Sequence, residues 1–376
     1  MTDVLEGGRQ RKNSTDTRHL GWVIYETLGI RTGEEPSVVS EGGQARDFAS
    51  RTRGTWEVAK RSNSDRAKAR EAAQNAVKSA YTSRKPLHDR VWLSGNRTAV
   101  AYADPLLSAE GDVFGVQVFV GAPGEAPPPP RTVGTFEWDY GTQRTRHSGP
   151  VEQKILGIDM SQPDRALPEI WQFFTAFDKR DAYTMYVGAF GHGELGAGAP
   201  FAAEISLKGD DGGFRCVHMT VRSIERAGQK SVGGLIHDIT DETPPKQDFH
   251  REYSKTQVMA LEKSLSEPMG IGYLELITGL FLEWDVPPPG PLARWATEVA
   301  QIHEKSRAEL DRARASLRNG EALSVDLVLF VRFSESEAWT PADLTITGVA
   351  TASAEHGVTV AQSTVLVRPG TSPQFW

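Results

Sequence analysis

The chain has 376 residues, which is too long for one ordinary domain and enough for two to four units that each bury a core. Hydrophobic residues make up 39% of the chain and charged residues 24%, a balance that excludes disorder throughout. The formal net charge of −7 argues against a chain that coats nucleic acid, because neutralising phosphates requires clustered Lys and Arg.

The single cysteine and the amino-terminal segment indicate the compartment. Cys216 is the only cysteine, which excludes an intramolecular disulfide and a cysteine-rich zinc site and fits a reducing cytoplasm. Residues 1–18 are polar and lack the apolar region of a signal peptide, so we expect a disordered tail. No apolar run approaches the roughly 20 residues that span a bilayer. We therefore predict a cytoplasmic protein that does not enter the membrane.

The first predicted unit covers residues 19–126. A helix is expected from about Ser64 to Ser83, where Ala, Lys, Arg and Glu predominate. The predicted strands lie at residues 22–25, 37–39, 89–93, 98–102 and 113–120. The four prolines of residues 127–130 fit neither a helix nor a central strand and therefore end the unit.

The second predicted unit, residues 131–243, repeats that order of elements. Tyr140-Gly141 marks a hairpin turn between its first two strands, and residues 167–186 are helical in pattern. The predicted strands lie at residues 135–139, 142–145, 201–208, 214–224 and 231–239.

A helical linker, residues 244–267, leads to a third predicted unit, residues 268–376. Thr278-Gly279 separates the strands of its opening hairpin, and a helix is expected over residues 292–317. The predicted strands lie at residues 271–277, 280–285, 324–333, 343–352 and 358–367. The plan of a hairpin, helices and three further strands thus occurs three times, and such internal repetition is stronger evidence than any single element.

Short motifs in the second unit resemble those of the PAS family. Phe136–Asp139 followed by Ile155–Gly157 is similar to the opening hairpin and the step after it, and Phe177–Asp181 stands where the family often has His-Pro-Asp-Asp. Gly233–Glu242 is similar to the closing strand and its Asp-Ile-Thr exit. The first and third units resemble the family less closely, and no such exit follows Trp339.

The resemblance implies a fold class and a role. The fold would be α+β, with tandem PAS-like domains that each contain a five-stranded antiparallel sheet with short helices on one face. The role would be that of a sensory protein of bacterial type, which binds a small molecule or a partner and acts on a separate output protein. A homodimer, a non-sensing interaction scaffold and a small-molecule enzyme remain open alternatives.

Aromatic residues of the second unit are the candidate walls of a ligand pocket. In the resembling family such side chains face a concave sheet, and in any small domain they equally form the core. The candidates are Phe136, Trp138, Trp171, Phe174, Phe177, Tyr183 and Tyr186.

The cofactor stays unknown, and we expect neither haem nor flavin. The second unit has no histidine between His147 and His192 to serve as an axial ligand in its helical region. Cys216 lies in a strand, whereas flavin-type photosensors of the family carry a reactive cysteine on a helix. Cys216 and His218 share a strand face, but no third group completes a nucleophilic or metal site, so we interpret them as structural.

No output module is recognisable, so we predict a protein that is not an enzyme. His250 lacks the continuation typical of a phosphoacceptor helix, and the only acid–base candidates are Asp178, Asp181 and His192. In the resembling family, the residues equivalent to Asp238 and Thr240 tie the closing strand to the following helix. We therefore predict that these two residues form a signalling exit to a helix at residues 248–266.

Overall fold

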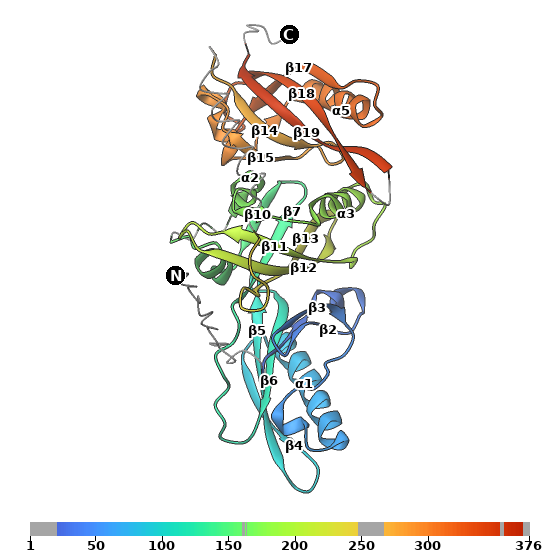
Figure 1. The fold of residues 1–376 in the computed structure, drawn as a ribbon, viewed down its shortest axis with the longest axis vertical. Helices are drawn as coiled ribbons and strands as arrows, with labels where there is room; N and C mark the ends of the chain where they lie inside the picture. Colours follow the sequence, from blue (N-terminus) through green and yellow to red (C-terminus); the bar gives the residue numbers. More distant parts are fainter. Residues whose placement is uncertain (1–20, 160–161, 163, 247–266, 354–356, 371–376) are drawn as a thin grey trace, which may run out of the picture.

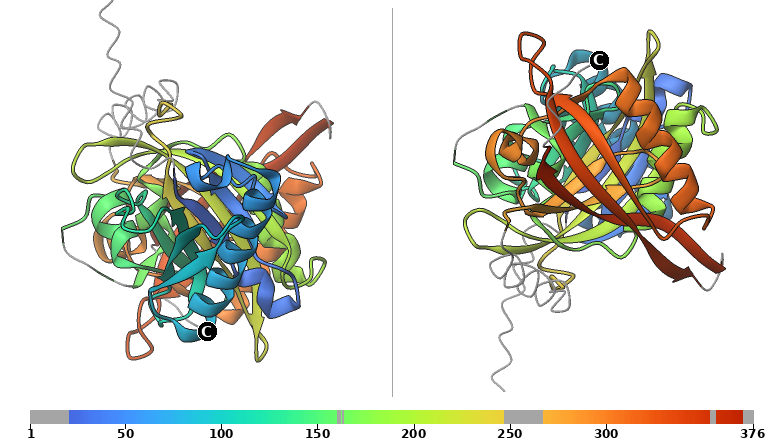
Figure 2. Two further views of the ribbon diagram at one scale, coloured as in Figure 1. Left: turned by 90° about the horizontal axis from the view of Figure 1, so that it is seen from below. Right: turned by 90° about the horizontal axis from the view of Figure 1, so that it is seen from above.

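The structure is a computed structural model, and it describes residues 21–159, 162, 164–246, 267–353 and 357–370. These residues form a mixed α+β fold with three antiparallel sheets stacked along the longest axis of the molecule (Figure 1). Seen from either end of that axis, the sheets lie over one another (Figure 2). Among the described helices none has both the length and the apolar character needed to span a bilayer.

The first sheet has six strands in the order β3-β2-β1-β6-β5-β4. Its elements are β1 (Val23–Glu26), η2 (Leu28–Thr32), β2 (Ser37–Glu41), β3 (Gln44–Ala49), η3 (Glu57–Ala59), α1 (Asn63–Ser83), β4 (Leu87–Trp92), β5 (Thr98–Leu107) and β6 (Val113–Gly121). The hydroxyl of Ser62 caps α1 by accepting from the Asp65 amide at 3.0 Å. Ala69, Ala73 and Ala80 face the sheet, and these small side chains let α1 approach it closely.

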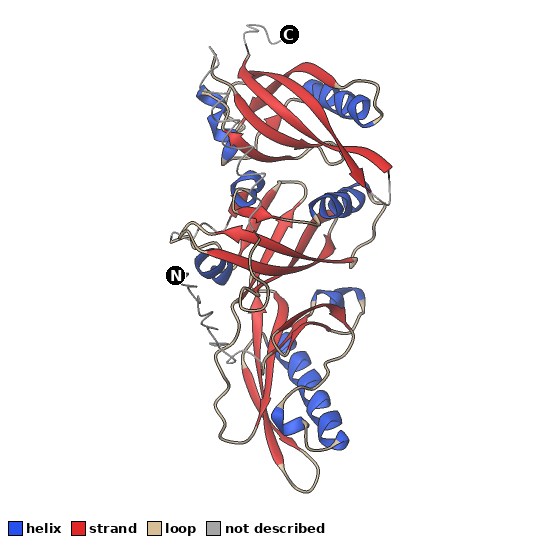
Figure 3. Cartoon of the chain, viewed as in Figure 1, coloured by secondary structure: helices blue, strands red, loops and turns tan. Residues whose placement is uncertain are grey.

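The second sheet has seven strands in the order β10-β11-β12-β13-β7-β8-β9. Its elements are β7 (Val133–Asp139), β8 (Arg144–His147), η4 (Val151–Ile155), β9 (Asp164–Ala166), α2 (Leu167–Trp171), β10 (Phe174–Ala176), α3 (Arg180–His192), β11 (Pro200–Lys208), β12 (Phe214–Arg226) and β13 (Gln229–Asp238). Both α2 and α3 lie between this sheet and the third one (Figures 1 and 3).

The third sheet has six strands in the order β15-β14-β19-β18-β17-β16. Its elements are β14 (Gly270–Glu275), β15 (Phe281–Val286), η5 (Gly290–Ala296), β16 (Gln301–Ile302), α5 (Glu304–Arg318), β17 (Ser324–Arg332), β18 (Thr340–Ser353) and β19 (Gly357–Pro369). The sheets lie within the three units predicted from the sequence, whereas the unit boundaries themselves stay predictions.

All three sheets contain the same five-strand core, in which the first strand of the opening hairpin pairs with the last strand of the unit. These cores read β2-β1-β6-β5-β4, β8-β7-β13-β12-β11 and β15-β14-β19-β18-β17. The prediction of five strands per sheet was wrong, because β3, β9, β10 and β16 extend the edges. Each added strand pairs with backbone groups that an edge would otherwise leave open.

Two helix predictions were also wrong. Residues 292–317 do not form one helix, because β16 pairs with β17 between η5 and α5, at Gln301↔Arg332. Residues 167–186 contain α2, β10 and the start of α3, since Phe174–Ala176 pairs with β11. The helix expected from Ser64 to Ser83 is confirmed as α1, whose 21 residues exceed the short helices that the family resemblance implied.

The first and second sheets pack face to face. One face of the first sheet is covered by α1, and the other contributes Ile24, Val39 and Phe114 to an apolar cluster that contains Ile224 and Leu235 of the second sheet. Gly115 permits this close approach, because a Cβ atom there would lie 2.7 Å from a Leu235 methyl group. The two sheets therefore share a core.

The second and third sheets meet through a hairpin. Leu280 and Leu282, at the turn and on β15, are buried in the same cluster as the inner face of the second sheet. A Cβ atom at Gly188 of α3 would lie 2.8 Å from Ile277, so glycine lets α3 contact the hairpin. This junction depends on apolar side chains from one short segment.

Candidate functional site

The seven aromatic candidates gather in one cluster on the inner face of the second sheet. Phe136 and Trp138 come from β7, and the other five come from α2, β10, α3 and the turn before α3. Trp171 contacts Phe174 and Phe177 with ring centroids 5.6 and 6.0 Å apart. The fold thus brings together all seven aromatic residues that the sequence analysis selected as pocket candidates.

Side chains fill the space inside this cluster. The cavity bordered by Trp138, Trp171, Tyr183, Leu280 and Leu282 measures about 20 Å³, room for about one water molecule and far below the roughly 300–1,000 Å³ of a ligand pocket. Burial raises the pKa of Tyr183 above its ordinary value, so its hydroxyl is neutral at physiological pH. The seven residues are packed as a core, and a ligand-binding role for them stays a prediction.

The proposed signalling exit is tied back onto the sheet. An Asp238 carboxylate oxygen accepts from the Thr240 amide at 2.9 Å and from the Thr240 hydroxyl. The Thr240 hydroxyl oxygen also accepts from the Cys216 amide at 3.0 Å, and Arg131 donates to the Asp238 carbonyl at 2.9 Å. The expected helix at residues 248–266 lies outside the described residues, so the coupling to it stays a prediction.

Cys216 and His218 face the first sheet from β12. The Nε2 atom of His218 lies 3.0 Å from a carboxylate oxygen of Asp47 on β3. Burial raises the pKa of the Cys216 thiol to about 11, so it is not a thiolate nucleophile at neutral pH. No cluster of three potential metal ligands occurs in the part of the chain that the structure describes.

His237 of β13 lies opposite His218, with ring centroids 5.0 Å apart. It is fully buried, and neither ring nitrogen has a hydrogen-bond partner among the described residues. Burial lowers the pKa of His237 well below its ordinary value, and the neighbouring His218 and Arg131 lower it further. The imidazole is therefore neutral at physiological pH.

Arg222 of β12 is a fully buried charge at the junction of the first two sheets. Its Nε atom donates to Glu26 of β1 at 2.9 Å, and a terminal nitrogen donates to the Gly198 carbonyl at 2.6 Å. The guanidinium also pairs with Glu34 at 2.8 Å and lies 5.0 Å from the centre of the Phe48 ring. Burial raises the pKa of Glu26, and the adjacent Arg222 opposes that rise.

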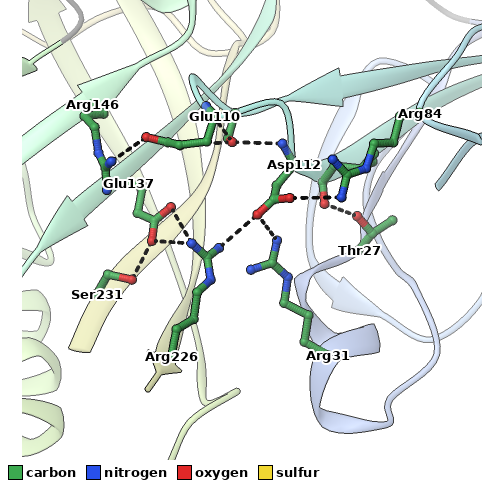
Figure 4. Close-up of polar contacts among 11 residues, drawn as sticks. Thr27, Arg31, Arg84, Glu110, Asp112, Glu137, Arg146, Arg226 and Ser231 are labelled. Carbon is green, nitrogen blue, oxygen red and sulfur yellow. Dashed lines mark hydrogen bonds and ion pairs between the residues drawn. The ribbon is translucent and has the colours of Figure 1, made fainter. Parts of the chain in front are cut away.

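A second polar group joins the same two sheets nearer the surface (Figure 4). Asp112, in the turn between β5 and β6, accepts from Arg31 at 3.0 Å and pairs with Arg226 at the end of β12 at 3.5 Å. Arg226 pairs in turn with Glu137 of β7 at 3.3 Å. Ion pairs therefore lie both inside the junction and at its rim.

The three acid–base candidates do not converge on one cleft. Asp178 pairs with Lys246 beside a cleft of about 440 Å³ between β3 and strands β10 to β12. His192, at the end of α3, borders a different cleft of about 350 Å³ between the second and third sheets. Asp181 accepts a hydrogen bond from Gln362. None of these contacts pairs one candidate with another.

Two features of the site were missed by sequence reasoning. Arg222 and Glu26 are 196 positions apart, and an arginine in a strand is ordinarily a solvent-facing residue. The one available signal was that Arg222 shares a face of β12 with Ile224. The cleft beside His192 was missed because its lining comes from two different units.

Comparison with known proteins identifies a family match for part of the chain. Residues 21–129 match the family described as Rv3651-like, N-terminal. None of the curated protein sequences matches the chain. By fold, the molecule is similar to the crystal structure of an uncharacterized protein from Mycobacterium tuberculosis, with a TM-score of 0.63 and 16% identity over 94% of this chain and 97% of that one. At this identity the similarity concerns the fold alone.

Sensory proteins also occur among the similar structures, at much lower scores. A sensory box histidine kinase/response regulator from Burkholderia thailandensis has a TM-score of 0.24 and 16% identity over 36% of this chain and 92% of that one. An RNA-binding light-oxygen-voltage receptor has a TM-score of 0.22 and 11% identity over 63% of this chain and 95% of that one.

Proposed function

We propose that this chain is a cytoplasmic regulatory protein of tandem PAS-like units that acts on a separate output protein by direct contact, without catalysis of its own. The observation that carries the proposal is the five-strand core, with the same strand order, shared by all three sheets. Three copies of one binding architecture in a single chain favour recognition over a single catalytic centre.

The packed interior of the second sheet favours a function that depends on contacts at the outer surface of the molecule. Its aromatic side chains leave about 20 Å³ beside the inserted hairpin, so the inner face that would hold a ligand is already occupied by Leu280 and Leu282. A partner would therefore contact the outside of the molecule.

The open edge of the first sheet is the surface that best fits a partner. β4 is the last strand of its sheet, and Trp92 at its end is 61% exposed. A groove of about 430 Å³ runs between β4 and α1 and contains Lys68, Glu71 and Arg90. An extended segment of a partner protein would add to the β4 edge and place an apolar side chain against Trp92.

Capture of partners from the cells that encode the chain tests this proposal. The wild-type chain should retain one protein reproducibly, and Trp92→Ala should lose it, since a large exposed aromatic residue is a typical binding hot spot. Leu323→Ala is the matched control, because Leu323 is 86% exposed in the third unit and far from β4 in sequence. Equal retention by the wild-type chain and Trp92→Ala would contradict contact at β4. Retention of no partner by the wild-type chain would contradict the proposed function itself.

A further inference from the structure

The cleft between the second and third sheets has the dimensions and the lining of a small-molecule site. Its volume of about 350 Å³ falls in the range of ligand pockets, roughly 300–1,000 Å³. Its walls come from the β7–β8 turn, α2 and the end of α3 on one side, and from the β14–β15 hairpin, η5 and α5 on the other. It lies outside the filled aromatic interior of the second sheet.

The apolar wall of the cleft is held rigidly. Phe281 and Trp295 pack with ring centroids 4.5 Å apart, and they are 8% and 3% exposed. Trp284 stacks on Phe281 and donates its ring N–H to the Trp295 carbonyl at 3.1 Å. Two fixed aromatic rings offer a flat ligand a surface that needs no rearrangement.

Two arginines of α5 supply positive charge to the same cleft. Arg314 is fixed by its Nε atom, which donates to the Leu276 carbonyl at 3.0 Å, and by Asp311 at 2.7 Å. Another terminal nitrogen of Arg314 donates to the Ile277 carbonyl. Arg307 lies one helical turn from Asp311, is exposed, and has no ion-pair partner among the residues that the structure describes.

The acidic residues of the cleft are already paired. Asp311 pairs with Arg314, and Glu298 pairs with Arg294 through two contacts of 2.7 Å. The charged side chains of the lining balance, Arg307 and Arg314 against Glu298 and Asp311, and Arg307 is the one of these four without an ion-pair partner among the described residues. An unpaired guanidinium that lines a pocket together with two aromatic rings favours an anion, and its planar fork suits the two oxygens of a carboxylate.

We propose that this cleft binds a small flat apolar molecule that carries a carboxylate. The ring system lies against Phe281 and Trp295, and the carboxylate accepts hydrogen bonds from Arg307. The proposal gives the protein a small-molecule ligand in addition to the partner protein proposed above. It does not depend on the β4 edge, so either proposal can fail while the other stands.

Competition for the purified full-length chain tests the assignment. The probe is 1-anilinonaphthalene-8-sulfonate, an aromatic anion whose fluorescence rises in apolar sites, and the competitors are indole-3-acetate and its uncharged analogue indole-3-acetamide. We expect saturable probe binding and displacement by indole-3-acetate. The amide should compete about tenfold more weakly or worse, because it carries no negative charge to pair with Arg307 and offers one acceptor oxygen where the carboxylate offers two.

Two charge reversals on α5 locate the site. Arg307→Glu should weaken both the probe and indole-3-acetate by about tenfold or more, whereas Arg312→Glu, on the same helix but outside the cleft lining, should leave both within about twofold. Both positions are exposed, and circular dichroism verifies that each variant folds. Absent probe binding, equal competition by the acid and the amide, or wild-type affinity in Arg307→Glu would each overturn the proposal. Trp92→Ala should bind the probe as the wild-type chain does.

Discussion

The two junctions of the molecule are built on different principles. Between the first and second sheets, two broad faces share an apolar cluster, and the buried pair of Arg222 and Glu26 crosses the boundary. Between the second and third sheets, a hairpin inserts Leu280 and Leu282 into a core, and a cleft of about 350 Å³ stays open beside it. The first junction joins two sheets into one body, while the second leaves room for a ligand.

The buried ion pair fixes the position of the first sheet relative to the second. Apolar faces tolerate sliding, but a guanidinium that must satisfy Glu26, the Gly198 carbonyl and Glu34 together is satisfied in a single arrangement of the sheets. Removing one partner of such a pair destabilises the folded protein by more than the intact pair stabilises it, because the remaining charge stays buried. We infer that the first two sheets unfold as one unit, and that the third sheet is held to them less tightly.

Removing the buried guanidinium should give the largest effect. Arg222→Ala leaves Glu26 buried and unpaired, and we expect it to lower the free energy of unfolding by about 3–5 kcal/mol. Lys78→Ala is the control, because it breaks an ion pair with Glu35 in which the two side chains are 57% and 76% exposed, and it should cost less than about 1 kcal/mol. Urea denaturation measures both. Similar losses of unfolding free energy in the two variants would show that the buried pair of Arg222 and Glu26 stabilises the junction no more than an exposed ion pair does.

Truncation of the hairpin tests the second junction. Leu282 is 1% exposed, and Leu282→Ala should cost about 2–5 kcal/mol through lost burial and a cavity next to Trp138 and Trp171. Leu323→Ala, at an 86% exposed position, should have little effect. Thermal unfolding followed by calorimetry compares them. A negligible loss for Leu282→Ala would mean that the hairpin does not hold the third sheet in place.

Acid should weaken the first junction through His237. Its pKa is lowered in the folded state, so below about pH 6.5 the unfolded chain binds a proton that the folded chain does not, and stability falls as pH falls. The slope from this residue is at most about 1.4 kcal/mol per pH unit. His237→Phe should flatten the dependence between pH 6.5 and 5, whereas His192→Phe, at an exposed position, should not. An unchanged slope in His237→Phe would assign the acid sensitivity to other groups.

The smallest effects are expected at the exit of the second sheet. Asp238→Ala and Thr240→Ala each remove a short side-chain bond that closes the end of β13, and each should cost about 1 kcal/mol. Backbone hydrogen exchange should then become faster in residues 239–243 and at the Cys216 end of β12. Thr240 lies in the first segment, and its hydroxyl oxygen accepts a hydrogen bond from the Cys216 amide. Unchanged exchange in these segments would leave the two residues without a role in closing the sheet.

Elements that depend on local sequence patterns could be predicted from the sequence, whereas elements that depend on contacts between distant segments could not. Strand β6 and the turn at Tyr140-Gly141 follow from alternation and turn chemistry, which are local properties of the chain. The edge strands β10 and β16 have two or three residues and carry too little pattern to be recognised. Their pairing depends on neighbours that only the folded sheet provides.

The candidate site shows the same division. The seven aromatic residues were found because apolar aromatics in a small unit gather in its core, whichever role they have. That the core would be filled was not predictable, since Leu280 and Leu282 come from another unit. Nor was the burial of Arg222, because nothing near it in the sequence shows that the first sheet covers the outer face of β12.

The most direct test of this account is hydrogen exchange of the full chain, followed by mass spectrometry at increasing urea concentration. If the first two sheets are one body, peptides from β1, β6, β12 and β13 should lose protection together at one urea concentration. Peptides from β17 and α5 should lose it separately and at lower urea, and Arg222→Ala should separate the first sheet from the second. Loss of protection in the first sheet while β12 and β13 stay protected in the wild-type chain would contradict the account.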